Sequence, residues 1–85
     1  MAPIALTLYS RPGCHLCDEM KEIAYRVAKE LGCSVAEVEI SADPELEARY
    51  GTEIPVLLVN GRKAFKYRLT EPELRKRLRA EEKAR

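Results

Sequence analysis

The first half of the chain alternates between short apolar runs and one long amphipathic stretch. Ile4 to Tyr9 is apolar enough for a buried strand, and the turn residues 10–13 interrupt it. From about Cys14 to Leu31, apolar residues recur at helical spacing between charged ones, and Gly32 is a natural C-terminal stop. Val35 to Ile40 then alternates apolar residues with glutamates, as an edge strand does. This order predicts a right-handed, parallel βαβ unit.

The second half predicts a short helix, a hairpin and a closing helix. The short helix begins with Asp-Pro cap signals and ends at residue 51. The continuous apolar run Val56–Val59 is typical of a central strand, and an Asn-Gly turn joins it to a returning strand, Arg62–Arg68. Thr70 and Glu73 form the capping box of the last helix.

The resulting order, β-α-β-α-β-β-α, predicts an α/β fold with a four-stranded mixed sheet flanked by helices. In the returning strand we expect Phe65 and Tyr67 on one face, with charged residues on the other to protect an exposed sheet edge. A chain of 85 residues suits one domain over residues 1–85. Its charged end, residues 79–85, is expected to fray.

The net charge and the composition of the N-terminal segment limit which partners and which cellular compartment we expect. The formal net charge of +1 favours neither nucleic acid nor membrane as a partner, so we interpret the basic residues in 62–68 as a solvated strand face. The N-terminal segment lacks the basic region and cleavage site of a signal peptide, and its apolar run is far shorter than a membrane span. We therefore expect a cytoplasmic monomer, in a compartment that keeps thiols reduced.

Cys14 falls where the first strand ends and the long helix begins. The unpaired N–H groups and the dipole of a helix N-terminus favour a negative charge, and the thiolate is the reactive form of cysteine. Arg11 and His15 flank this position, and either cation would lower the pKa of Cys14 further. Cys17, one turn later, is expected to face the core. The motif therefore predicts two-step disulfide exchange, in which Cys14 attacks and Cys17 resolves the mixed disulfide.

Metal binding is the main alternative. Cys14, His15, Cys17 and Cys33 are candidate ligands, and an odd total of three cysteines argues against a disulfide scaffold. Cys33, however, follows a helix of about eighteen residues, roughly 27 Å long, and cannot reach the same ion within one chain. We therefore assign no metal site. Two further alternatives stay open: an iron–sulfur cluster that bridges Cys14 of two chains, and a non-catalytic interaction module.

Two segments carry a resemblance to known proteins. Tyr9-Ser10-Arg11-Pro12-Gly13-Cys14-His15-Leu16-Cys17 resembles the active-site segment of glutaredoxins and thioredoxins, and residues 48–59 resemble the thioredoxin segment around its cis-proline. From the residues alone, Pro55 could equally open a strand in the trans form. The similarity spans nearly the whole chain and is closest to the short glutaredoxin-like proteins.

The resemblance implies a thioredoxin fold and a dithiol oxidoreductase. It implies a cis Ile54-Pro55 bond beside the cysteine pair, with the Ile54 backbone pairing with an extended substrate. It also places Arg11 where glutaredoxins carry a lysine near the glutathione carboxylate. The implied partners are a disulfide-containing protein or small molecule and a thiol or reductase as external electron donor, with no bound cofactor.

The chain departs from the glutaredoxin pattern at several positions. His15 and Leu16 replace the usual proline and tyrosine between the cysteines, and Glu53 replaces a threonine of the glutathione site. The bulky, basic segment 65–68 stands where that site uses a Gly-Gly pair followed by acidic residues. These departures predict poor use of glutathione.

Overall fold

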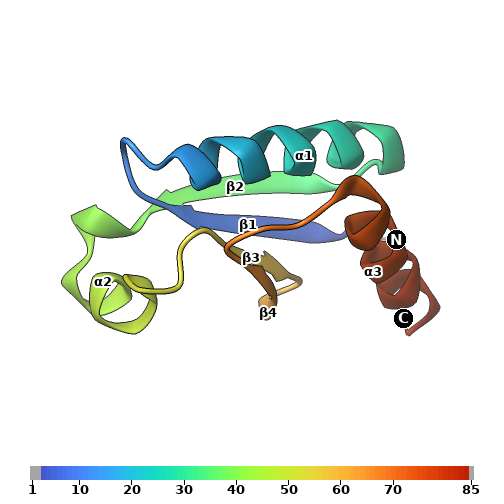
Figure 1. Cartoon of the computed structure of the whole chain (residues 1–85). Coiled ribbons are helices and arrows are strands. Elements are labelled where there is room, and N and C mark those ends of the chain that lie inside the picture. Colours follow the sequence, from blue (N-terminus) through green and yellow to red (C-terminus); the bar gives the residue numbers. More distant parts are fainter. Residues whose placement is uncertain (1–2, 85) are drawn as a thin grey trace.

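The computed structural model describes residues 3–84. Its elements follow the predicted order, with one added turn of 3₁₀ helix (Figure 1). In chain order they are β1 (Ala5–Ser10), α1 (His15–Leu31), β2 (Ser34–Glu39), η1 (Ile40–Ala42), α2 (Pro44–Tyr50), β3 (Val56–Val59), β4 (Arg62–Lys66) and α3 (Glu71–Lys83).

The four strands form one mixed sheet in the order β2-β1-β3-β4. β1 and β2 are parallel, as the βαβ prediction requires, whereas β3 runs antiparallel to both β1 and β4. β2 and β4 are therefore the edge strands, and both carry charged residues on their exposed positions. The predicted four-stranded mixed sheet flanked by helices is confirmed.

The hydrophobic core lies between one face of the sheet and the helices α1 and α3. The pairing of β1 with β3 places Leu6 opposite Val59 and Leu8 opposite Leu57, so these side chains share a face. Met20 of α1 and Leu74 of α3, neither more than 1% exposed, pack on this face. The core cluster comprises Ile4, Leu6, Leu8, Met20, Ala24, Val27, Ala28, Leu57, Val59, Leu69, Leu74 and Leu78.

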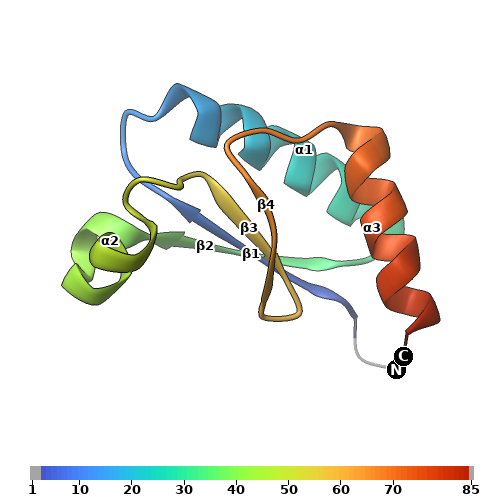
Figure 2. The same cartoon turned by 60° about the horizontal axis from the view of Figure 1, so that its bottom comes forward.

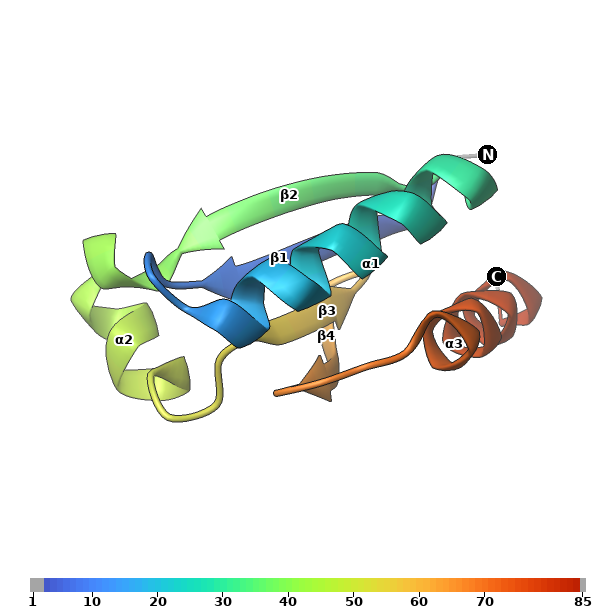
Figure 3. The same ribbon diagram turned by 45° about the horizontal axis from the view of Figure 1, so that its top comes forward.

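α2 lies apart from the other two helices. Figure 1 shows α1 above the sheet and α2 below its left end, and Figures 2 and 3 show α3 beside the C-terminal part of α1. The rings of Tyr9 and Tyr50, whose centroids are 4.8 Å apart, join α2 to the end of β1. This contact holds α2 close to the loop that leads out of β1.

The structure corrects the predicted returning strand. β4 ends at Lys66, and Tyr67 adopts a left-handed backbone with φ of +68°. Tyr67 is 44% exposed and does not share a strand face with Phe65, which packs partly against the core. The N–H of Tyr67 donates to the carbonyl of Pro55 at 2.8 Å, and the register with β3 shifts between Leu57 and Leu58. A bulge and a non-local hydrogen bond therefore override the alternation of the sequence.

The last helix, α3, includes residues 79–83 of the segment expected to fray, and the fraying itself stays a prediction. α3 begins with the predicted capping box, in which Thr70 and Glu73 each accept from the other's backbone N–H. The helix then continues to Lys83, so residues 79–83 are helical. Residue 85 lies outside the described part of the chain.

Candidate functional site

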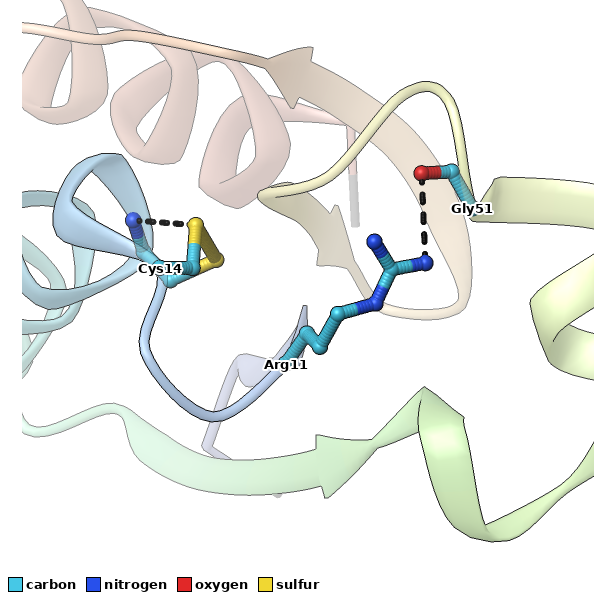
Figure 4. The surroundings of a disulfide bond; sticks show 4 residues. Arg11, Cys14 and Gly51 are labelled. Carbon is cyan, nitrogen blue, oxygen red and sulfur yellow. Dashed lines mark hydrogen bonds between the residues drawn. A yellow bond between two sulfur atoms is a disulfide. The ribbon is translucent and has the colours of Figure 1, made fainter.

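Cys14 is the N-cap residue of α1. β1 ends at Ser10, and Gly13, with φ of +75°, lets the connecting loop turn into the helix. The backbone N–H of Cys17 donates to Sγ of Cys14 at 3.1 Å (Figure 4). The sulfur of Cys14 thus takes the place of a capping oxygen, in the position where a helix N-terminus favours a negative charge.

Cys14 and Cys17 form a disulfide, with their Cα atoms 5.2 Å apart. The two sulfurs have different surroundings. Cys17 is 3% exposed and faces the core, as expected, while Cys14 is half-buried at the end of the helix. An incoming group can therefore approach Cys14, whereas Cys17 is shielded.

Arg11 does not point at this disulfide. Its guanidinium forms an ion pair with Glu47 of α2 and donates to the carbonyl of Gly51 at 3.4 Å. Figure 4 shows the side chain extending away from Cys14 toward Gly51. Glu47 was not singled out from the sequence, because 36 residues separate it from Arg11 and no periodicity links them. The action of Arg11 on the pKa of Cys14 stays a prediction.

The His15 side chain is largely exposed to solvent. It is 89% exposed, and its Nε2 lies 3.8 Å from a carboxylate oxygen of Glu19, one turn further along α1. The effect of His15 on the pKa of Cys14 likewise stays a prediction.

The Ile54-Pro55 peptide bond is cis, as the resemblance implied. Pairing of Tyr9 with Val56 puts Pro55 beside Ser10, the last residue of β1, where the loop to Cys14 begins. Figures 1 to 3 agree that the connection from α2 to β3 and the N-terminal end of α1 lie at the same end of the sheet. The N–H of Ile54 donates to the carbonyl of Tyr50 at 3.1 Å. That internal bond occupies the N–H of Ile54, one of the two backbone groups through which this residue could pair with a substrate.

Two hollows flank the start of α1. One, of about 310 Å³, runs along α1 beneath the segment after β4, and the sequence did not predict it because it depends on the turn at Tyr67. The other, of about 410 Å³, is more polar and reaches the buried cysteine. The first hollow is lined by residues that include Leu16, Met20, Ile23, Tyr67 and Arg68. The second is lined by residues that include Arg11, Gly13, Cys17, Lys21 and Glu39.

The chain is similar to a known protein family and to solved structures that share this fold. Residues 5–79 match the family described as Glutaredoxin-like domain (DUF836). The chain belongs to this glutaredoxin-like family.

Proteins similar to this glutaredoxin-like chain include some of known structure and one whose name describes it as glutaredoxin-like. The X-ray structure of a structural genomics target protein from X. campestris is 37% identical, covers 88% of this chain and 96% of its own, and superposes with a TM-score of 0.76. A protein of Dictyostelium discoideum named as glutaredoxin-like is 27% identical over 84% of this chain and 71% of its own length. A thioredoxin variant from Halobacterium salinarum, 18% identical, covers 86% of this chain and 69% of its own with a TM-score of 0.65, which shows the shared thioredoxin fold.

The remaining features concern metal, membrane and the third cysteine. Within residues 3–84 of this glutaredoxin-like chain, no three His, Cys, Asp or Glu side chains gather in a way that would hold a metal ion. Across the same residues, no helix has both the length and the apolar character needed to cross a membrane. Cys33 is a half-buried free thiol just beyond α1, and burial, with the nearby Glu82, raises its pKa.

Proposed function

We propose that this glutaredoxin-like protein is a thiol–disulfide oxidoreductase, with Cys14 as the attacking and Cys17 as the resolving thiol. One observation carries the proposal: a half-buried cysteine caps a helix, accepts the Cys17 N–H, and is joined to a cysteine that is 3% exposed. A thiolate at Cys14 would be stabilised by that N–H and by the helix dipole. The shielded thiol reacts only after the first step has brought a mixed disulfide to it.

The reaction moves two electrons from the dithiol to the substrate. The Cys14 thiolate attacks one sulfur of the substrate disulfide; a bond forms to Sγ, the substrate S–S bond breaks, and the released thiolate takes up a proton. Cys17 then loses its proton and attacks Sγ of Cys14, which releases the second substrate thiol and leaves the Cys14–Cys17 disulfide. An external dithiol or reductase returns the two electrons.

The substrate would lie across the surface between Cys14 and the Ile54-Pro55 segment. The cis bond and the register of β1 with β3 bring this segment to the end of the sheet where α1 starts. We propose that the Ile54 carbonyl meets an extended substrate segment. We further propose a monomer that acts in the cytosol, where a reducing pool can regenerate the dithiol.

A reductase assay on a protein disulfide tests the proposal. Two donor systems are offered in parallel: glutathione with its reductase, and a dithiol thioredoxin system. Turnover that depends on Cys14 and Cys17, and survives Cys33→Ser, is the expected result. Absence of turnover with both donors and with dithiothreitol, in folded and fully reduced protein, would refute the proposed activity.

A further inference from the structure

Arg11 lies in the loop before Cys14 and is already bound to a carboxylate of its own chain. Its guanidinium pairs with Glu47 and also donates to the carbonyl of Gly51 at 3.4 Å. Both side chains are only partly exposed, at 38% and 40%. A cation three residues from the attacking sulfur is a natural attractor for an anionic substrate, but here an internal acid holds it.

A second internal carboxylate lies two residues before Pro55. Glu53 accepts from Nζ of Lys63 at 2.7 Å, and Nζ of Lys66 lies 3.9 Å from the same oxygen. The hydrogen bond from Lys63 holds the pKa of Glu53 below its ordinary value, so this group stays ionised. Both lysines belong to β4, and Lys66 pairs with Val56 at the start of β3. Lys63 and Lys66 are thus also engaged by an acid of the protein.

Glu47 and Glu53 come from one short stretch of chain, α2 and its connection to β3. From there they reach cations on two different elements, the loop after β1 and the strand β4. A substrate carboxylate that approached Cys14 would therefore have to displace an acid of the protein to pair with Arg11, Lys63 or Lys66. Until it did, the charge of the cation would be offset by the acid that holds it.

We infer that Glu47 and Glu53 act as internal carboxylates that occupy Arg11, Lys63 and Lys66, the cations nearest in the chain to Cys14 and on β4, so that this protein selects disulfides without a neighbouring carboxylate. This inference rests on the proposed oxidoreductase function and names its substrate class: neutral disulfides, such as those within a polypeptide, rather than small acidic ones. Exchanging one partly exposed ion pair for another yields no net gain in affinity. Removing one internal acid should improve the reaction of an anionic disulfide about fivefold, the factor that corresponds to one partly exposed ion pair.

The test compares two small disulfides of the same shape, dithiodipropionic acid and its diamide. The full-length Cys17→Ser protein is reduced and mixed with each, and intact mass follows the rate at which the Cys14 adduct forms. The readout is the ratio of the diacid rate to the diamide rate, divided by the same ratio for a free model thiol. Glu47→Gln should raise this ratio about fivefold, and Glu53→Gln should raise it by a similar factor.

Matched variants separate this effect from a general change of charge. Glu45→Gln alters the same helix by the same charge at an exposed position outside both ion pairs, and should leave the ratio unchanged. Arg11→Gln added to Glu47→Gln should abolish the gain, because the cation that the acid releases is then missing. Circular dichroism checks that each variant is folded, and the two acids provide independent tests if one variant fails to fold.

The outcomes distinguish the inference from the function on which it rests. Equal gains for Glu45→Gln and Glu47→Gln, no gain for either ion-paired acid, or a gain that persists without Arg11 would overturn the inference while adduct formation still upheld the thiol chemistry. Failure of Cys14 to form an adduct with either disulfide would instead remove the proposed function, and the inference with it.

Discussion

Reduction of the Cys14–Cys17 disulfide distinguishes a bond that serves chemistry from one that holds the fold together. The two cysteines are separated by 3 positions, so the bond closes a very short loop. In the chain-entropy model, closing a loop of about four residues lowers the entropy of the unfolded chain by about 6 cal/mol/K, or about 2 kcal/mol at 25 °C. A domain of this length has a total stability of roughly 4–13 kcal/mol. Oxidation should therefore add between about a sixth and a half of this total.

The reduced protein regains part of that difference. The Cys17 N–H that contacts Sγ of Cys14 at 3.1 Å makes a stronger hydrogen bond with a thiolate, and the helix dipole adds to it, for about 1 kcal/mol together. We expect the oxidised form to be more stable by only about 1 kcal/mol where Cys14 is ionised, or roughly 4–8 °C in Tm. A thiolate favoured by folding has its pKa lowered in the folded state. Its stabilising contribution is present at high pH and is lost as the pH falls through that pKa. The advantage of the oxidised form should then grow toward about 2 kcal/mol.

Urea unfolding with and without a phosphine reductant, at several pH values, measures this difference. The Cys14→Ser/Cys17→Ser double variant is the control and should not respond to the reductant. An oxidised form more stable than the reduced one by well over 3 kcal/mol would identify a structural staple and refute the loop-entropy reasoning. A difference that does not change with pH would refute the stabilisation of a Cys14 thiolate by the helix terminus.

Four further outcomes are expected. Cys17→Ser should accumulate a mixed disulfide on Cys14 after exposure to a model disulfide, whereas Cys14→Ser should form none, as intact mass and peptide mapping would reveal. Purified protein should be colourless and keep its reductase activity after chelation; stoichiometric iron or zinc would support the cluster alternative. The hydrogen bond from Tyr25, followed by the one from Lys21, lowers the pKa of Glu37, so that this contribution to stability is present at neutral pH and lost as the carboxylate is protonated. Tyr25→Phe should therefore lower the urea midpoint at neutral pH, and the difference between the two proteins should shrink as the pH falls through the lowered pKa of the Glu37 carboxyl. Thr70→Ala should lose the side-chain half of the capping box and about 1 kcal/mol of stability, a fall in Tm of roughly 4–8 °C.

The cysteine pair shows how far a local pattern reaches. The turn residues before Cys14, the helical spacing after it and the apolar neighbours of Cys17 are all features of adjacent sequence. They predicted a cysteine at the start of the helix and a buried partner, and both are present; that the sulfur of Cys14 caps the helix came from the structure. A cis Ile54-Pro55 bond was not derivable from the residues, since proline tolerates either form at a strand start; it came from the resemblance.

Sequence by itself determined the elements, the mixed sheet and the position of the cysteine pair, because periodicity, caps and turns act between residues close together in the chain. Only the tertiary structure decided the partners of the charged side chains. Arg11 meets Glu47 across 36 residues, and this contact turns it from Cys14 toward α2. The end of β4 was likewise decided by folding. The N–H of Tyr67 donates to the carbonyl of Pro55, and Tyr67 therefore does not continue the strand. Ion pairs and single hydrogen bonds depend on distances in space that no spacing along the chain encodes, so the electrostatic surroundings of the site follow from the fold.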